Sequence, residues 1–244
     1  LSILMQLLTL FEAREATEDK AVIGSGVMFI CSQYPRFLTS NYSVLKVIVS
    51  KLVEFMTDEY EGVKQMAVSS FKTIAEKCKR SFIVELGQNE SLFSEIVSKI
   101  STIAPALEGK DPMLCVQFYD ALSIIISAFT TESLKIQAVE KLMAYPNEQW
   151  EYFAANFNVT DEKSVTGVTY NLRYVAIIAD NTSQAFHQQF QARFETMLQL
   201  YAACWSHGNE VCNGAEGNNL ANAICEALAA VASVIGRFCK RVRG

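Results

Sequence analysis

Apolar residues recur at intervals of three and four along almost the whole chain. In residues 41–56, for example, Leu45, Val49 and Leu52 would share one face of a helix, whereas no strand-like alternation lasts more than a few residues. Short polar breaks divide the pattern into ten segments, which predict helices over residues 1–15, 18–34, 41–56, 60–80, 89–106, 112–129, 132–144, 160–179, 183–206 and 218–240. The chain is therefore predicted to be all-α.

Local signals mark several of the helix ends. Asp111–Pro112 combines an N-cap residue with proline at the first helical position, where a missing N–H costs nothing. Asn41, Thr131 and Ser183 are further N-cap candidates because their side chains can accept a hydrogen bond from a backbone N–H. Tyr145–Asn147 contains a proline and predicts the end of the helix over 132–144.

Taken in pairs, the predicted helices repeat at a regular distance. The pairs begin near residues 1, 41, 89, 132 and 183, a step of about 40–50 residues that is typical of helical-hairpin repeats of the HEAT type. Up-and-down bundles rarely contain so many helices. We therefore expect an α-solenoid of about five HEAT-type hairpins, with two repeats in residues 1–80 and about three in residues 81–244.

Composition argues against several classes of function. Half of the residues are hydrophobic, which is enough for a large core. The net charge of −5 and the pI near 5.2 argue against a dedicated nucleic-acid-binding protein. The chain has two histidines, and neither belongs to a recognisable arrangement of nucleophile, base and acid, so we expect no enzyme.

Two further patterns have ordinary structural explanations. Cys204, His207 and Cys212 have the spacing of half a zinc site, but residues flanking a loop at a helix end are the favoured interpretation. Leu220–Phe238 is long and apolar enough to raise the question of a membrane span. Because Glu226 lies near its middle, a solenoid helix buried between its neighbours is favoured instead.

The predicted helices over 1–15 and 41–56 carry more apolar surface than one packing face requires. Each has a second apolar stripe at helical spacing, which in the later helix includes Val44, Ile48 and Phe55. Two interpretations remain open. The extra stripes either pack against adjacent repeats, as in a generic HEAT scaffold, or line a hydrophobic groove that accepts an amphipathic peptide.

Two runs of sequence resemble a known protein family. Gln33–Leu38 reads QYPRFL and Lys51–Met56 reads KLVEFM, and at this distance they are similar to the central part of nuclear export receptors of the exportin-one family, which are karyopherin-β proteins. The spacing is kept from about residue 1 to 155, and the resemblance thins beyond 160. Further matching positions are Gly62–Val63, Met66–Ala67, Ile74–Ala75, Lys77–Cys78, Phe118–Tyr119, Glu140–Lys141, Pro146–Asn147 and Trp150.

The resemblance implies a function for the groove. Members of the family are rings of HEAT repeats that bind leucine-rich export signals of cargo proteins between the outer helices of two consecutive repeats. They bind cargo cooperatively with Ran in its GTP form, interact with nuclear pore proteins and shuttle between nucleus and cytoplasm. By this resemblance, residues 1–80 would form the signal groove, with no cofactor and with neither nucleic acid nor membrane as a partner.

Position by position, the resemblance also implies which residues line the groove. Lys51 matches a family lysine that approaches the peptide backbone and selects signals sterically; Glu54 beside it could hold it by charge, and Lys20 matches a basic residue at the groove edge. The complete set comprises Leu4, Leu8, Phe11, Lys20, Gly24, Val27, Met28, Val44, Val47, Ile48, Lys51, Glu54, Phe55 and Met66.

Phe11 stands where the family pattern has its reactive groove cysteine. Because phenylalanine offers no thiolate, we expect the protein to resist Michael-acceptor inhibitors of the leptomycin type. The measurement is intact-protein mass spectrometry after incubation with such an inhibitor, together with peptide displacement. A covalent adduct that also displaces a bound export peptide would contradict the prediction.

Overall fold

The computed structural model describes residues 6, 18–85, 90–109, 111–211 and 219–242; within these ranges, residues 18–22, 183, 209–211, 219–221 and 237–242 are described by their backbone alone. The described residues form eleven α-helices and one 3-10 helix, and no strand. In chain order these are α2 (Glu18–Ser32), α3 (Pro35–Ser40), α4 (Tyr42–Phe55), α5 (Glu61–Phe82), α6 (Leu92–Val97), α7 (Ile100–Leu107), α8 (Met113–Ile126), α9 (Glu132–Asn156), α10 (Glu162–Thr182), η1 (Ser183–Phe186), α11 (His187–Val211) and α12 (Asn219–Val242).

The helices follow the predicted order, with differences at their ends. The short helix α3 was not predicted; it begins at Pro35, whose fixed backbone angle suits the first helical position. The predicted helix over 89–106 is divided into α6 and α7. Helix α6 begins only after Ser91, whose side chain accepts a hydrogen bond from the Ser94 N–H. Thus local side-chain bonds set these boundaries more finely than apolar spacing does.

The predicted caps are partly realised. Thr131 caps α9, because its Oγ1 accepts the Leu134 N–H at 3.4 Å. Asp111 Oδ1 accepts the Met113 N–H at 3.1 Å, but α8 begins at Met113, so Pro112 occupies the N-cap position that was predicted for Asp111. Asn41 occupies the N-cap position of α4, but its side chain makes no capping bond and donates to the Phe37 carbonyl instead. Ser183 begins the 3-10 helix η1 and is not its N-cap.

The predicted helix end at Tyr145–Asn147 is wrong. Helix α9 continues through Pro146 to Asn156, although proline removes one backbone hydrogen bond. Pro146 is buried, and its carbonyl accepts a hydrogen bond from Asn171 Nδ2 of α10 at 2.9 Å. Tertiary packing therefore overrides the local preference of proline here.

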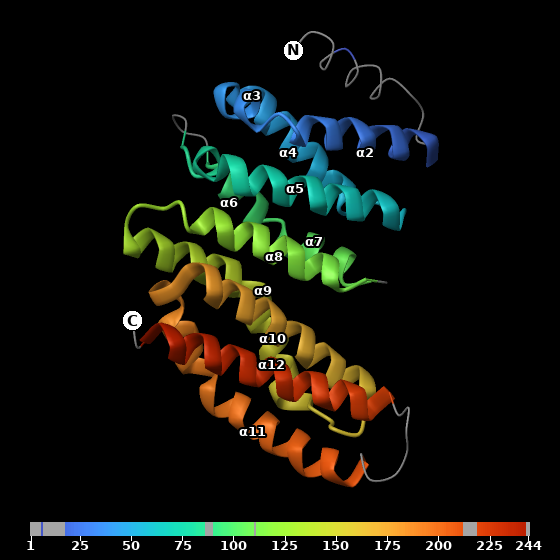
Figure 1. Ribbon diagram of the computed structural model, residues 1–244, viewed down its shortest axis with the longest axis vertical. Coiled ribbons are helices and arrows are strands. Elements are labelled where there is room, and N and C mark those ends of the chain that lie inside the picture. Colours follow the sequence, from blue (N-terminus) through green and yellow to red (C-terminus); the bar gives the residue numbers. More distant parts are fainter. Residues whose placement is uncertain (1–5, 7–17, 86–89, 110, 212–218, 243–244) are drawn as a thin grey trace. The chain divides into compact units, whose positions relative to one another are not determined.

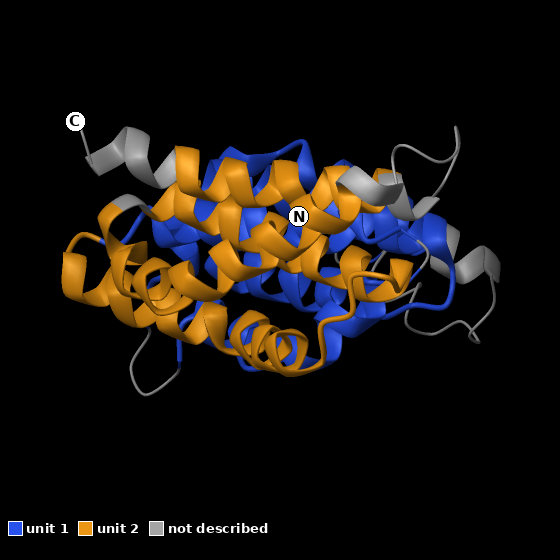
Figure 2. Cartoon of the chain, turned by 90° about the horizontal axis from the view of Figure 1, so that it is seen from below, with its two compact units in different colours: residues 1–129 blue, residues 130–244 orange. Residues whose placement is uncertain are grey.

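The chain divides into two compact units, residues 1–129 and 130–244 (Figure 2). In the first unit, α2, α5 and α8 pack side by side in that order, while α4 packs against α2 and α5, and α7 against α8 (Figure 1). In the second unit, α9 pairs with α10, α11 pairs with α12, and α10 packs along α12. Both units are stacks of paired helices, which confirms the predicted all-α solenoid of helical hairpins. The assignment of residues 1–80 and 81–244 to separate groups of repeats stays a prediction.

Aromatic rings hold the first unit together. Phe71 of α5 packs edge-on against Phe82, with 5.9 Å between ring centroids, and against Phe118 of α8 at 5.7 Å. All three rings are fully buried. Because such pairs stabilise a core beyond the area they bury, they fix α5 against α8.

A buried arginine organises the second unit. Arg193 of α11 is only 3% exposed, and its guanidinium donates to the side-chain carbonyl oxygens of Asn171 and Asn147. It also lies over the Trp150 ring, 5.2 Å from the centroid. Burial lowers the pKa of Arg193 to about 10, so the group stays charged at neutral pH. One side chain thus connects α9, α10 and α11.

Replacing Arg193 with alanine should destabilise the protein by about 2–4 kcal/mol, because it leaves the buried Asn171 and the half-buried Asn147 amide oxygens without this donor and opens a cavity beside Trp150. The control is Arg173→Ala, which removes a more exposed ion pair with Glu226 and should cost less than about 1 kcal/mol. Urea unfolding followed by circular dichroism measures both. Equal, small losses would show that the Arg193 contacts do not hold the unit together.

Candidate peptide-binding groove

Helix α4 carries most of the described residues of the predicted groove. Its first apolar stripe, represented by Leu45 and Leu52, is buried. In the predicted second stripe, Val44, Ile48 and Phe55 are buried as well. The helix is therefore enclosed along both stripes except at Val47, a member of the second stripe that is 38% exposed.

Helix α2 supplies a second group of predicted groove residues. Gly24, Val27 and Met28 are all buried, on a helix that packs against α4 and α5. Met66 of α5 is half-buried. The structure therefore brings the α2 and α4 residues into adjoining helices. The other predicted residues, Leu4, Leu8, Phe11 and the side chain of Lys20, lie outside the described residues.

Val47 and Glu54 are the most accessible described residues of this predicted surface on α4, and Lys51 between them is half-buried. Val47 is 38% exposed, although Val44 and Ile48 on the same stripe are buried. Lys51 lies one turn further on, and its Nζ is 2.9 Å from a carboxylate oxygen of Glu54. The ion pair expected from the sequence is thus formed, and it holds the ammonium group towards Glu54, further along the helix.

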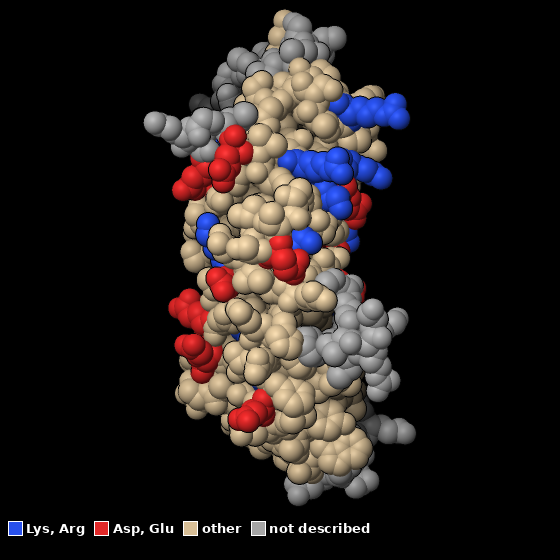
Figure 3. Space-filling view, turned by 90° about the vertical axis from the view of Figure 1, so that its left-hand side faces the viewer, with Lys and Arg blue, Asp and Glu red and all other residues tan. Residues whose placement is uncertain are grey.

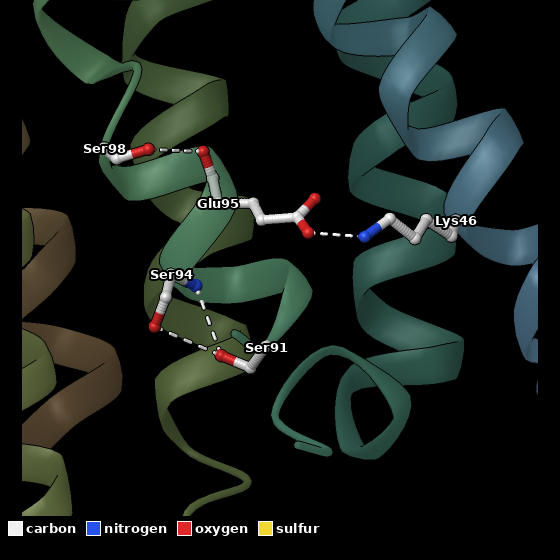
Figure 4. Close-up of polar contacts among 5 residues, drawn as sticks. All are labelled: Lys46, Ser91, Ser94, Glu95 and Ser98. Atoms are coloured by element: carbon white, nitrogen blue, oxygen red, sulfur yellow. Dashed lines mark hydrogen bonds and ion pairs between the residues drawn. The ribbon is translucent and has the colours of Figure 1, made fainter. Parts of the chain in front are cut away.

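A second lysine of α4 is held by a residue that sequence reasoning missed. Lys46 Nζ lies 2.5 Å from Glu95 Oε1 of α6, 49 positions along the chain (Figure 4). The hydrogen bond with Glu95 raises the pKa of Lys46. Such a pair between distant segments leaves no signal in the sequence, and it neutralises a charge that would otherwise lie near the predicted groove.

The described residues contain neither a cluster of metal-ligating side chains nor a helix that could span a membrane. Within the described ranges, no group of three or more His, Cys, Asp or Glu side chains could hold a metal ion. Cys204 of the predicted half zinc site is buried, and Cys212 lies outside the described residues. No helix in the described part of the chain is long and apolar enough to cross a membrane.

Comparison with known proteins gives consistent matches. The chain is 34% identical over 223 residues to Exportin-1 of Schizosaccharomyces pombe, which covers 89% of the chain. It is 38% identical over 207 residues to Protein EXPORTIN 1A of Arabidopsis thaliana (82% of the chain) and 34% identical over 170 residues to Exportin-1 of Drosophila melanogaster (68% of the chain). The chain belongs to the exportin-1 family.

These matches confirm the resemblance seen in the sequence and bound its extent. The chain spans 20% of the length of the Schizosaccharomyces pombe exportin-1, 19% of the Arabidopsis thaliana protein and 16% of the Drosophila melanogaster exportin-1. No protein-family model matches the sequence. The family assignment therefore rests on similarity to exportin-1 proteins over 68–89% of this chain, together with the stacked helical hairpins.

Cys31 lies on α2, the helix that carries the predicted groove residues Gly24, Val27 and Met28, but it cannot supply the reactive thiol that is absent at position 11. Cys31 is buried, and burial raises the pKa of its thiol from 9.0 to about 11. At neutral pH its thiolate fraction is therefore about 100-fold below that of an ordinary thiol.

We expect iodoacetamide to alkylate Cys31 at least about 100-fold more slowly in the folded protein than in urea, because both access and ionisation are restricted. Exposed Cys225 is the internal control and should react readily in both states. The rate at Cys31 should rise with pH towards its raised pKa. Quantitative mass spectrometry of the peptides gives the rates, and fast native alkylation of Cys31 would disprove its protection.

Proposed function

We propose that this chain is a cargo-binding segment of a nuclear export receptor, and that it binds leucine-rich export signals against α4. The observation that carries the proposal is the second apolar stripe on α4, with Val47 open to solvent beside the Lys51–Glu54 pair. Membership of the exportin-1 family supports the same function, because the relatives are named as exportins.

The described burial constrains how a signal could bind. Val44, Ile48 and Phe55 are buried, so a peptide that uses them as pocket walls must first uncover them. Any opening that is only fractionally populated weakens the apparent affinity by that fraction. Binding would therefore begin at Val47 and proceed by separation of α4 from its neighbours.

The expected affinity follows from simple magnitudes. A leucine-rich signal that buries four or five apolar side chains gains roughly 6–15 kcal/mol, at ~1.5–3 kcal/mol for each. Association and ordering of a flexible peptide remove about 5 kcal/mol or more of this gain. The remaining binding free energy is about −8 kcal/mol or weaker, which corresponds to a dissociation constant of about 1 μM or higher.

Lys51 would act on the peptide backbone. Lys51 follows Val47 by one helical turn, and its ammonium group can donate to peptide carbonyls, while Glu54 restricts where the group can move. A signal whose backbone approaches too closely would meet the lysine sterically. By the family resemblance, Phe11 and Lys20 would complete the wall and the edge of the groove.

For the whole receptor, we propose the properties of an exportin. Cargo binding would be coupled to Ran-GTP by about 1–3 kcal/mol, a typical coupling energy. The receptor would interact with nuclear pore proteins and shuttle between nucleus and cytoplasm. It would act without enzymatic chemistry or a cofactor, and without direct contact to nucleic acid or membrane.

One observation favours a second candidate, a HEAT scaffold with no peptide groove. Both apolar stripes of α4 are buried, as they would be if they served only to pack adjacent repeats. This candidate predicts that export peptides do not bind at all, whereas the groove proposal predicts weak, saturable binding that depends on Val47.

The test is fluorescence anisotropy of a labelled leucine-rich export peptide titrated with the protein. Val47→Glu should reduce the affinity at least tenfold, or about 1.4 kcal/mol, because it places a charge on the apolar contact. Val84→Glu is the matched control, since Val84 is also a valine of the first unit and is 41% exposed. It should leave the affinity within about twofold of the unmodified protein.

The remaining outcomes separate the alternatives. Equal binding by all three proteins would move the site away from α4 but leave the family assignment intact. No binding by any of them would favour the scaffold. Circular dichroism of each variant shows whether lost binding reflects lost folding.

A further inference from the structure

Three of the nine tyrosines in the chain are exposed. Tyr34 and Tyr152 are each 63% exposed and Tyr60 is 41% exposed, whereas the other six are buried or half-buried. An enzyme that modifies a phenol must reach its oxygen atom. These three side chains are therefore the candidate positions for covalent modification of tyrosine in the folded protein.

Tyr60 lies on the short connection between α4 and α5. Its backbone is extended, with φ −86° and ψ 117°, and its N–H donates to Asp58 Oδ1 at 2.9 Å. Its phenol forms no hydrogen bond and no ring contact with any residue that the structure describes. The described contacts therefore leave the phenol able to enter the active site of another protein.

Acidic residues surround Tyr60 in the sequence. Asp58 and Glu59 precede it and Glu61 follows it, while the nearest cation along the chain, Lys64, lies about one helical turn further on in α5. Glu59 is exposed, and Asp58 and Glu61 are half-buried. This charge pattern is complementary to a protein kinase whose substrate groove is basic.

Tyr34 shares the exposure and the non-helical backbone of Tyr60 but not its charge. It lies directly before α3, which carries Arg36, and no acidic residue lies within five positions of it. On the side of the molecule where α3 lies, Lys and Arg side chains gather in the upper part (Figure 3). A kinase with a basic substrate groove is repelled by such surroundings.

Tyr152 shares the acidic neighbours of Tyr60 but not its backbone. Glu148 and Glu151 precede it, and all three residues lie inside α9. A kinase groove accepts an extended segment, so the helix around Tyr152 must unwind before it can enter. Unwinding costs free energy and reduces the accessible fraction of the substrate. Tyr60 is thus the one tyrosine that combines exposure, an extended backbone and acidic neighbours.

We propose that Tyr60 is a phosphorylation site for a tyrosine kinase that selects acidic substrates. In this reaction the phenolic oxygen attacks the γ-phosphorus of Mg-ATP, and the new O–P bond forms as the bond to ADP breaks. The phenol proton passes to the catalytic aspartate of the kinase, and the products are phosphotyrosine and ADP. The site does not depend on the proposed export groove.

The fold accommodates the product. A phosphate group carries about −1.5 to −2 charges at pH 7. Tyr60 immediately precedes α5, a helix of 22 residues, and the N-terminus of a helix favours negative charge. Lys64, whose Nζ lies 3.7 Å from Glu61 Oε2, provides a cation in the first turns of the same helix. The modification is therefore compatible with the folded state.

The experiment incubates the full chain with Mg-ATP and the catalytic domain of a tyrosine kinase that phosphorylates copolymers of Glu and Tyr. Mass spectrometry of the digested protein gives the initial rate of phosphorylation at each tyrosine. We expect Tyr60 to react at least about tenfold faster than Tyr34, which lacks acidic neighbours, and than Tyr152, which lies in a helix.

A charge variant and a matched control test the recognition of the acidic neighbours. Asp58→Asn/Glu59→Gln should lower the rate at Tyr60 about tenfold, because two ion pairs with the kinase are lost. The asparagine keeps an oxygen that can accept the Tyr60 N–H. Glu148→Gln/Glu151→Gln removes the same charge from α9 and should leave the rate at Tyr60 within about twofold. Circular dichroism shows whether both variants are folded.

Three results would overturn the proposal. They are absence of phosphate at Tyr60, a rate at Tyr34 or Tyr152 that equals the rate at Tyr60, and an unchanged rate at Tyr60 in the folded Asp58→Asn/Glu59→Gln variant. None of these results bears on binding of an export peptide, so failure here is distinct from failure of the proposed groove.

Discussion

The burial of α4 along both of its apolar stripes is the constraint on which the proposed function depends. Such a helix is held by neighbours on both sides, so any ligand that needs one stripe must compete with contacts already made. Val47 is the exception, since it remains partly open between the buried Val44 and Ile48. The same feature therefore stabilises the repeat stack and would limit the affinity of the proposed groove. Recognition of a peptide there would require movement of α4 against its neighbours.

Charge is distributed around this helix in an ordered way. The Lys51–Glu54 pair lies on α4 itself, and Lys46 is neutralised by Glu95 of α6. Pairs of this kind contribute little free energy when exposed, but they fix where an ammonium group points. The charged side chains of α4 are thus balanced on either side of Val47, the one apolar side chain of this helix that is clearly exposed.

The motif that carried part of the family resemblance in the second unit has a structural role. Pro146, Asn147 and Trp150 all lie around the Arg193–Asn171 bond: Asn171 donates to the Pro146 carbonyl, Asn147 accepts from Arg193, and Trp150 faces the guanidinium. A buried cation with neutral partners is costly unless every contact is kept, which makes the arrangement of the three helices specific. Sequence reasoning recognised these residues but could not name their partner, because Arg193 lies more than one helix away.

Periodicity alone determined that the chain is all-α, roughly where most helices lie and that they form repeated hairpins, because each helix must bury an apolar face. It also identified the second stripe on α4, while the family resemblance pointed to Lys51 with Glu54 beside it; both are local features. Only the tertiary structure decided that α9 runs through Pro146, that Glu95 neutralises Lys46 and that both stripes of α4 are buried. The same holds at position 167, where a Cβ atom would lie 2.6 Å from the Phe153 ring, so that a larger residue there requires the ring to move. These outcomes depend on which distant residues meet, and helical spacing carries no information about that.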